Sequence, residues 1–456
     1  MQCFTVWSNE IEERLDPYYV KSISNIRNIN TNYQIVALSS ILKEPPQYGA
    51  NESATDGNPK TDVRYIRITD IDEFGNLKNN DWKTATNVDE KYLLKEKDIL
   101  FARSGATAGK TFIYDKSIGK AIFAGYLIRF RIDETKANPS FVFYYTHLKR
   151  YNYWLKLIQR PSGQPNINAE EFKSFKIPLP PLSIQNQIVD IMRSAYAQKK
   201  QMEAEAQKLL DSIDSYVLEE LGIKLPAVEA KMCFVVDLEE VQNNRMDAYY
   251  YQPTFEEVEK ALEEGKYRIE KLKEFITKIH YGISIENVYV DEGIPLLRIL
   301  NLKPNKIDLR DVVNLEESKR KEIGNGFVYE GDLLISRSGS VGIVSVVPKE
   351  ADGFAFGSFM IKFCVNDEVN KEYVSIWLNN KISKLLTERE KIGAIQGNIT
   401  ISTIENYLVP LPPLEIQNKI AGEVKRRISE AERLKAEAGR LIEEAKKQVE
   451  KMILGN

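Results

Sequence analysis

The chain has 456 residues, of which 43% are hydrophobic and 28% charged, with a formal net charge of −3, three cysteines and two histidines. Its length predicts several domains rather than one core, and its charge excludes a uniformly basic coat while allowing a local basic face. The cysteines show no CxxC spacing and no apolar run approaches the ~18 residues of a membrane span, so we expect a cytoplasmic protein without a metal centre or disulfide framework.

The predicted elements follow one another in the same order in two copies. An Arg-x-Asp-x-Tyr-Tyr element at 14–19 returns at 245–250. Three apolar, strand-like stretches then lie at 65–71, 97–105 and 125–130, and their counterparts lie at 296–302, 331–339 and 358–363. The repeat predicts one mixed, strand-rich domain in each half of the chain.

A helix is predicted next in each copy. It begins at Asn138-Pro139 in the first copy and at Asn370 in the second, where asparagine is a favoured N-cap and proline suits the first helical position. Apolar residues extend it through Leu148 and Leu385. A Gln-x-Asn-Ile segment follows, at 164–167 and again at 396–399.

A proline strap is the clearest repeated segment. Pro-Leu-Pro-Pro-Leu-x-Ile-Gln-Asn occupies residues 178–186 and 410–418, and the two starting positions differ by 232. Because proline fixes φ and lacks an N–H group, the strap is not helical, and we expect it to be rigid in both copies.

A long helix is predicted after each strap. The first runs from about Ser183 to Leu221, just before Gly222, and the second from Glu415 to about Leu454. Apolar residues recur at the three-to-four spacing of a coiled-coil seam, which Lys435 interrupts in the second helix. A helix of roughly 40 residues is about 60 Å long. Because neither apolar seam is stable in water when it is exposed, we expect the two helices to pack antiparallel against each other. Two separate helices, each docked on its own domain, are the alternative.

Several candidate catalytic motifs fail on inspection. Residues 104–111 resemble a phosphate-binding loop, but three residues separate Gly105 from Gly109 where that motif requires four. No glycine-rich strand-to-helix turn is present for S-adenosylmethionine. His147 stands opposite Asn379 in the repeat and His280 opposite Gln47, without a nucleophile nearby in sequence. We expect no catalytic residue, metal or cofactor site in this chain.

Taken together, the sequence resembles the specificity subunits of type I restriction-modification systems. The resemblance covers the whole chain and rests on the two straps, the long helices behind them, the Arg-Ser-Gly turns at 103–105 and 337–339, and the Arg-x-Asp-x-Tyr-Tyr elements. It implies an α+β protein that reads double-stranded DNA without catalysis. Each of two target-recognition domains would bind one half of an interrupted site. The paired helices would set the gap and dock two methyltransferase subunits, and restriction or translocase subunits would complete the complex.

The repeat also indicates which residues read bases. If the halves read different sequences, residues identical in both copies cannot carry the difference, so the Arg-Ser-Gly turns are expected to shape the fold or hold phosphates. Base readers are expected in polar loops where the copies diverge. The candidate DNA-binding residues are Arg103, Ser104, Arg337, Ser338, Lys60, Arg160, Gln164, Asn166, Lys391, Gln396 and Asn398.

The predicted boundaries follow from the straps. Residues 1–182 and 225–414 are predicted as target-recognition domains, and 183–224 and 415–456 as the spacer helices.

Three other hypotheses remain open at this point. They are the specificity subunit of a related, type IIB-like restriction-modification enzyme, a fused modification enzyme with an unrecognised active site, and a coiled-coil scaffold whose duplicated domains bind protein.

Overall fold

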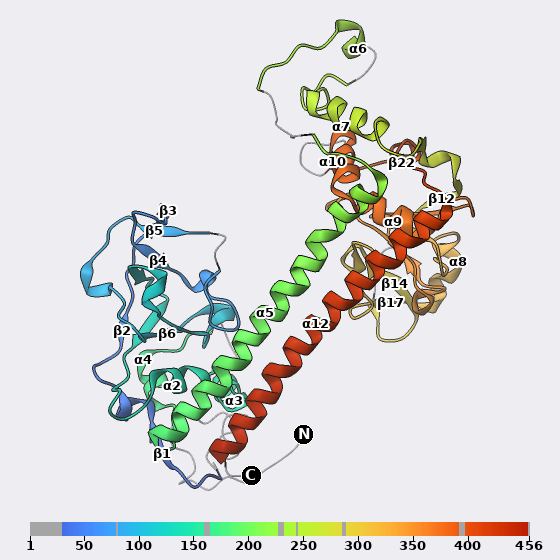
Figure 1. Ribbon diagram of the computed structural model, residues 1–456. Helices are drawn as coiled ribbons and strands as arrows, with labels where there is room; N and C mark the ends of the chain where they lie inside the picture. The colour runs from blue at the N-terminus through green and yellow to red at the C-terminus, as the bar shows by residue number, and fades with distance from the viewer. Residues whose placement is uncertain are drawn as a thin grey trace. The chain divides into compact units, whose positions relative to one another are not determined.

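The computed structural model describes residues 30–78, 81–158, 165–226, 232–242, 245–284, 289–391 and 397–454. The chain divides into two compact units, residues 1–202 with 436–456, and residues 203–435 (Figure 1). The first Arg-x-Asp-x-Tyr-Tyr element and the candidate residues Arg160, Gln164 and Gln396 lie outside the described residues. Within the described ranges, no helix combines the length and the apolar character needed to span a bilayer.

The first unit is built on a four-stranded antiparallel sheet. Its strands, in spatial order, are β2 (Gln47–Tyr48), β9 (Leu127–Phe130), β6 (Ile99–Ala102) and β7 (Thr111–Ile113). All residues of β6 and β9 are buried, because successive side chains alternate between two covered faces. Phe101 and Phe130 enter one hydrophobic cluster, and Leu100 and Leu127 enter another.

Smaller pairings surround this sheet. The strands β1 (Gln34–Ala37) and β10 (Lys176–Leu179) pair antiparallel, as do β3 (Ala54–Asp56) and β5 (Lys83–Ala85), whereas β4 (Arg64–Ile66) runs parallel to β8 (Ala121–Phe123). The helices of this domain are α2 (Pro139–Tyr145), α3 (Lys149–Ile158) and α4 (Ala169–Ser174).

The second unit repeats this topology. Its four-stranded sheet has the order β12 (Ile276–Tyr281), β21 (Met360–Val365), β18 (Leu333–Ser336) and β19 (Val344–Val346). β11 (Ile269–Lys271) pairs with β22 (Leu408–Pro410), and β14 (Ile294–Leu297) runs parallel to β20 (Ala355–Phe356). The remaining strands are β13 (Tyr289–Val290), β17 (Val313–Leu315), β15 (Leu302–Lys303) and β16 (Lys306–Ile307). Its helices are α6 (Leu238–Gln242), α7 (Pro253–Glu263), α8 (Arg320–Ile323), α9 (Lys371–Asn379), α10 (Lys381–Glu390) and α11 (Ile401–Glu405).

One detail of the helix prediction was wrong. A single helix was expected after each asparagine cap, but each copy has two, α2 and α3 or α9 and α10. The caps themselves are confirmed, since Asn138 accepts from the Ser140 N–H group at 2.9 Å and Asn370 from that of Tyr373 at 2.9 Å. In the second copy, Asn380 ends α9 with an extended backbone and caps α10 with its side chain. A short polar residue that can bond to its own backbone thus divides the apolar run.

The proline strap forms part of a small ladder in each copy. Pro178 pairs with Ile35 across β10 and β1, and Pro410 pairs with Ile269 across β22 and β11. Each ladder has only two strands, so the missing N–H groups of proline interrupt no larger sheet.

The glutamine after each strap joins the domain to its long helix. Gln185, 1% exposed, donates to the Pro180 carbonyl at 2.8 Å and accepts from the N–H group of the cap residue Asn138 at 2.8 Å. Gln417 repeats both bonds with Pro412 and Asn370, at 2.9 and 2.7 Å. We call each arrangement the glutamine clasp. It accounts for the identical glutamine of the two straps, and the asparagine that follows each one accepts from the side chain of the same cap residue, at 2.8 and 2.7 Å.

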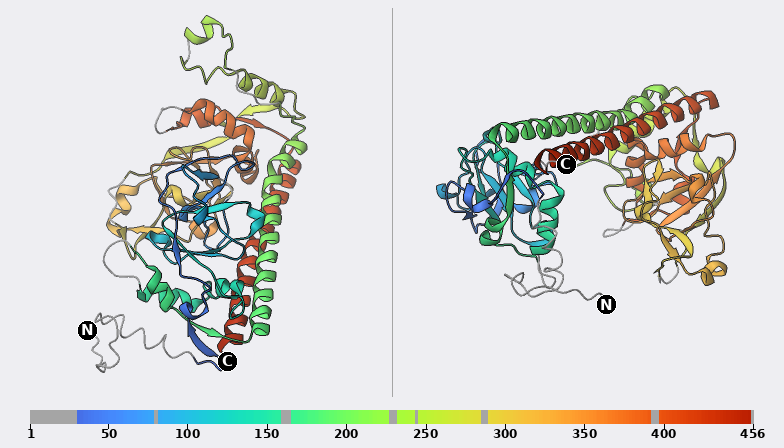
Figure 2. Two further views of the ribbon diagram at one scale, coloured as in Figure 1. Left: turned by 90° about the vertical axis from the view of Figure 1, so that its left-hand side faces the viewer. Right: turned by 90° about the horizontal axis from the view of Figure 1, so that it is seen from below.

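The long helices are α5 (Leu182–Leu221) and α12 (Leu414–Leu454), each beginning one residue before its predicted start. They run side by side in the views of Figure 1 and Figure 2. In the first unit the start of α5 packs with the end of α12, through Ile188, Met192, Ala195, Ile442, Ala445 and Val449. In the second unit the end of α5 packs with the start of α12, through Val217, Leu221, Ile420 and Val424.

The predicted α+β fold with an antiparallel helix pair is therefore confirmed. One detail of the seam differs from the prediction, because Lys435 is exposed and the neighbouring Leu434 is buried.

Candidate nucleic-acid interface

An arginine lies over a tyrosine ring at the same place in both units. Arg103 follows β6, and its guanidinium carbon is 5.0 Å from the ring centre of Tyr48 on β2. Arg337 follows β18, and its guanidinium carbon is 4.8 Å from the ring centre of Tyr281 on β12. Such cation–π contacts hold a guanidinium group in a defined plane. Each tyrosine hydroxyl also accepts a backbone N–H group, from Ala169 at 3.0 Å or from Ile401 at 3.4 Å.

Backbone bonds fix the arginine from both sides. The Arg103 N–H group donates to the Tyr126 carbonyl at 3.0 Å, and its carbonyl accepts from Ile167 at 2.8 Å. Arg337 makes the same two bonds with Phe359 and Ile399, at 2.9 and 3.0 Å. The aromatic residue opposite each arginine is exposed, Tyr126 by 63% and Phe359 by 51%.

The predicted asparagines reach the same spot. Asn166 bridges to Ser104 and Asn398 to Ser338 as isolated β-bridges, so each asparagine lies beside the Arg-Ser turn of its own copy. In the first copy the Arg103 Nε donates to the Asn166 side chain at 3.3 Å. In the second copy Ser338 makes the bond to the Asn398 side chain instead. The buried Nε of Arg337 has no hydrogen-bond partner among the described residues.

These residues define a surface that we call the arginine–aromatic patch. It comprises Tyr48, Arg103, Tyr126 and Asn166 in the first unit, and Tyr281, Arg337, Phe359 and Asn398 in the second. The sequence prediction identified the arginines and asparagines but missed the aromatic residues. The repeat contained a signal for the two tyrosines. Gln47 and His280 occupy equivalent positions in the two copies, and a tyrosine follows each of them.

Of the remaining described candidates, Lys60 lies apart from these contacts, whereas Lys391 lies against Gly397, the neighbour of Asn398. Lys60 is exposed in a turn, where its own N–H group bonds to the Asn58 side chain at 3.0 Å. The ammonium group of Lys391 pairs with Glu388 at 3.1 Å at the end of α10.

A buried carboxylate underlies the strand that carries each arginine. Asp98, just before β6, accepts two hydrogen bonds from Arg131 at 2.7 and 2.8 Å, and this pairing raises the pKa of Arg131. Asp332, just before β18, pairs with the ammonium group of Lys362 at 3.2 Å and accepts from the Cys364 thiol at 3.0 Å. Both carboxylates are paired, as buried charges must be. They hold the strand in register and are not available to a ligand.

No catalytic constellation emerges from the described residues. Burial, and then the bond to Asp332, raise the pKa of Cys364 to about 11, which disfavours a nucleophilic thiolate. Across the described ranges, no three His, Cys, Asp or Glu side chains gather closely enough to hold a metal ion.

Comparisons with known proteins agree with the duplicated architecture. The family model for the type I restriction modification DNA specificity domain matches residues 30–211 and 267–437. The MjaVIII specificity subunit of Methanocaldococcus jannaschii is 22% identical over 93% of this chain and 92% of its own, and the putative MjaX subunit is 26% identical over 80% and 79%. A type I S subunit from M. genitalium shares the fold, with a TM-score of 0.50 and 13% identity over 93% of this chain and 97% of that one. Since the two matches of the family model cover more than half of the sequence, one in each half, the chain belongs to the family of type I restriction-modification DNA specificity proteins.

Proposed function

We propose that this chain supplies DNA sequence specificity to a type I restriction-modification complex and performs no catalysis itself. Residues 1–182 and 225–414 act as target-recognition domains, each reading one half of an interrupted site. Residues 183–224 and 415–456 act as spacer helices that set the gap and dock two methyltransferase subunits. Restriction or translocase subunits join the same complex, in the cytoplasm.

The observation that carries the proposal is the duplicated arginine–aromatic patch. Arg103 and Arg337 have equivalent backbone bonds and equivalent tyrosine supports, so they are suited to a contact that is common to both half-sites. Phosphate is that common element, and base edges are what differs. The exposed aromatic residue beside each arginine adds a face that stacks on a sugar or base.

The residues around the common arginines differ between the copies, as sequence-specific readers require. Lys391 lies against Gly397, the neighbour of Asn398 in the second patch, whereas Lys60 belongs to a separate loop of the first copy. The two asparagines accept bonds from different groups, Arg103 in one case and Ser338 in the other. An amide that reads an adenine edge discriminates by about 1–3 kcal/mol against the wrong base.

Mapping methylated adenines tests the proposal directly. The chain is expressed with its methyltransferase partner in a host that lacks adenine methylation of its own. We expect methylation at one bipartite motif, and a strong reduction at all sites when Arg103 and Arg337 are both replaced by alanine. Arg310→Ala is the control, because this arginine is 90% exposed, pairs with Asp308 and belongs neither to the patch nor to the spacer helices. Methylation of the same motif by the partner alone would refute the proposal.

The spacer role has its own test. Inserting seven residues into both α5 and α12 preserves a heptad seam and lengthens the pair by about 10 Å, or about three base pairs of B-DNA. We expect the gap between half-sites to grow by about that amount, with both half-sites unchanged. An unchanged gap in an active, folded variant contradicts the spacer model.

Incubating the isolated chain with labelled S-adenosylmethionine and DNA tests the absence of catalysis. We expect no transfer of label until the methyltransferase is added. Transfer by the chain alone would favour a fused modification enzyme.

A further inference from the structure

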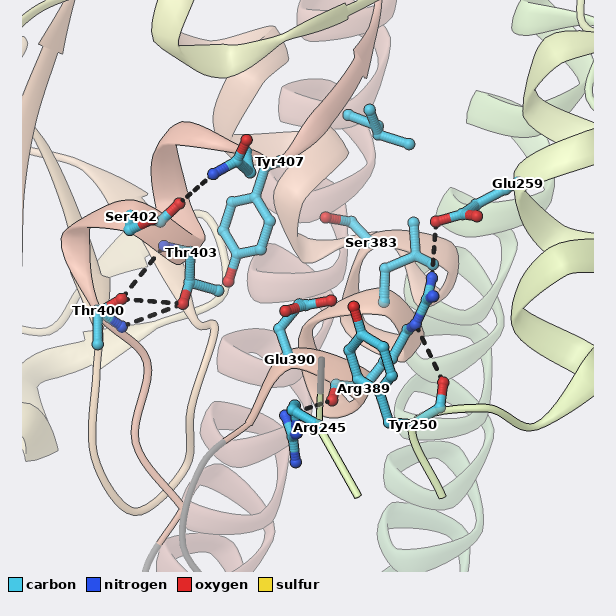
Figure 3. A pocket seen from close by; sticks show the side chains of 13 residues that line it. Arg245, Tyr250, Glu259, Ser383, Arg389, Glu390, Thr400, Ser402, Thr403 and Tyr407 are labelled. Atoms are coloured by element: carbon cyan, nitrogen blue, oxygen red, sulfur yellow. Dashed lines mark hydrogen bonds and ion pairs between the residues drawn. The ribbon is translucent and has the colours of Figure 1, made fainter. Parts of the chain in front are cut away.

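The Arg-x-Asp-x-Tyr-Tyr element has no part in the arginine–aromatic patch, yet its second copy makes specific contacts. Figure 3 shows Arg245 and Tyr250 beside the end of α10. The two terminal nitrogens of Arg245 each donate at 3.1 Å, one to the carbonyl of Arg389 and the other to that of Lys391. The Asp247 carboxylate accepts from the Nε of Arg245 at 2.7 Å and so orients the guanidinium plane.

These bonds complete the end of a helix. The last four carbonyls of an α-helix lack partners within it, and a cation at that end also interacts favourably with the helix dipole. α10 has no glycine at its end, and its cap residue Lys391 is extended, with φ −61° and ψ 130°. The planar fork of Arg245 therefore takes the place of an ordinary C-cap, a geometry that lysine cannot supply.

A second arginine fastens the same turn from the helix side. Arg389 lies 4.5 Å above the ring of Tyr250 and donates to the Tyr250 carbonyl at 3.2 Å. It also donates to Glu259 on α7 at 2.7 Å. The ring of Tyr250 thus contacts both guanidinium groups, since that of Arg245 is 5.2 Å from its centre.

A cavity lies beside these residues. The volume of this cavity is about 410 Å³. Arg245 lines it together with Arg389 and Glu390, which lie at the end of α10, and Thr400 and Thr403 line it at the start of α11 (Figure 3). Asn398 of the arginine–aromatic patch lies two residues before Thr400. Lys391, which follows α10, lies against Gly397, the neighbour of Asn398, since a Cβ built on Gly397 would stand 1.7 Å from the Cε of Lys391.

We infer that Arg245, Asp247 and Tyr250 form a carbonyl clamp that fixes the end of α10, and with it Lys391, for DNA reading by the second domain. The clamp touches no reacting group; it acts through Lys391, whose side chain lies against Gly397 beside Asn398. This inference rests on the proposed function of the patch. It assigns a role to a repeated element that the patch does not include, and it predicts that damage to the clamp affects one half-site only.

Hydrogen exchange of the full-length chain tests the clamp without any assumption about DNA. The variants are Arg245→Ala and Arg245→Lys, with Arg310→Ala as the control, because Arg310 is 90% exposed in the same unit and pairs with Asp308. Arg245→Ala should speed exchange of peptides covering the end of α10, residues 385–391, about tenfold, through the loss of two charge-assisted bonds. Arg245→Lys should restore only part of the protection, and Arg310→Ala should change nothing there. Equal exchange in wild type and Arg245→Ala overturns the clamp.

Methylation mapping with the partner subunit tests the reading role. Arg245→Ala should relax or weaken recognition of the half-site read by the second domain and leave the other half-site intact. Faster exchange with both half-sites unchanged overturns the positioning role. Absence of bipartite methylation in the wild type refutes the proposed function instead, and the exchange result then still decides whether the clamp exists.

Discussion

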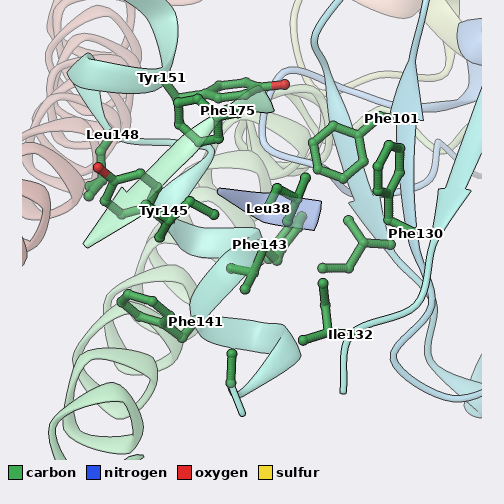
Figure 4. Packing of buried hydrophobic residues seen from close by; sticks show 14 of the residues in the cluster. Leu38, Phe101, Phe130, Ile132, Phe141, Phe143, Tyr145, Leu148, Tyr151 and Phe175 are labelled. Atoms are coloured by element: carbon green, nitrogen blue, oxygen red, sulfur yellow. The ribbon is translucent and has the colours of Figure 1, made fainter. Parts of the chain in front are cut away.

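The replacement His147→Asn should remove a specific part of the acid sensitivity of the first unit. The His147 ring centre lies 4.5 Å from that of Phe143, which belongs to the buried cluster of Figure 4, and 6.2 Å from that of Tyr196 on α5. Its Nδ1 is buried and has no hydrogen-bond partner among the described residues. Burial, and then the charge of Lys446, lower the pKa of His147 to about 3 from an ordinary value of 6.5.

The sign and size of the effect follow from linkage. The folded chain keeps His147 neutral, whereas the unfolded chain takes up a proton below pH 6.5, so stability falls as the pH drops from 6.5 towards 3. Between pH 7.5 and 5.5 the loss amounts to about 1.4 kcal/mol. The ring is partly exposed, which makes this figure the upper limit. Asparagine does not titrate, and it is the residue at the matching position of the second unit, Asn379.

Urea unfolding at both pH values provides the measurement. A deuterium pulse at one fixed pH, with mass spectrometry of peptides from residues 139–158, reports the first unit. The wild type should lose about 1.4 kcal/mol more than His147→Asn between the two pH values. His280→Asn changes the other histidine of the chain, which lies in the second unit, so the exchange of these first-unit peptides should follow that of the wild type. Equal losses in wild type and His147→Asn would show that His147 is not held neutral, and the reasoning would fail.

Two further substitutions test the joints of the fold. Gln417→Ala removes the bonds to the Asn370 N–H group and the Pro412 carbonyl. It should destabilise the second unit by about 2–4 kcal/mol in urea unfolding. As the control, replacing the exposed Gln187 with alanine should cost less than about 0.5 kcal/mol. Equal losses of stability in the two variants would show that the glutamine clasp does not stabilise the second unit. Gly109→Ala should cost more than Gly119→Ala in the same assay. Both glycines have positive φ, of 90° and 85°. Only at Gly109 would an added Cβ clash, because it would lie 2.4 Å from the Leu155 side chain. Similar losses of stability in the two variants would mean that the surroundings of Gly109 are loosely packed.

The sequence predicted what local pattern and duplication determine. Each long helix was placed to within one residue at its start, because a proline strap fixes where it begins and its seam spans many turns. The caps at Asn138 and Asn370 were predicted correctly for the same local reason.

Features that depend on contacts distant in sequence were missed. Nothing local marks Tyr48 as the support of Arg103, because the two lie 55 positions apart and meet only when β2 pairs with β9 beside β6. The glutamine clasp joins residues that lie 47 positions apart, so the local sequence did not predict it either. The division of the α9–α10 run was missed because apolar periodicity outweighed the local signal of Asn380.

The core of the first unit has a consequence for how the protein is made. This core takes Ile442, Ala445, Val449 and Ile453 from α12, the part of the described chain that a ribosome adds last. Residues 203–435 are synthesised in between, which takes roughly ten to fifty seconds at ordinary elongation rates. During that interval Ile188 and Met192 of α5 lack the α12 residues of this core and share it only with residues of the first unit that are already made. The core of the first unit is therefore complete only after the whole second unit has been synthesised.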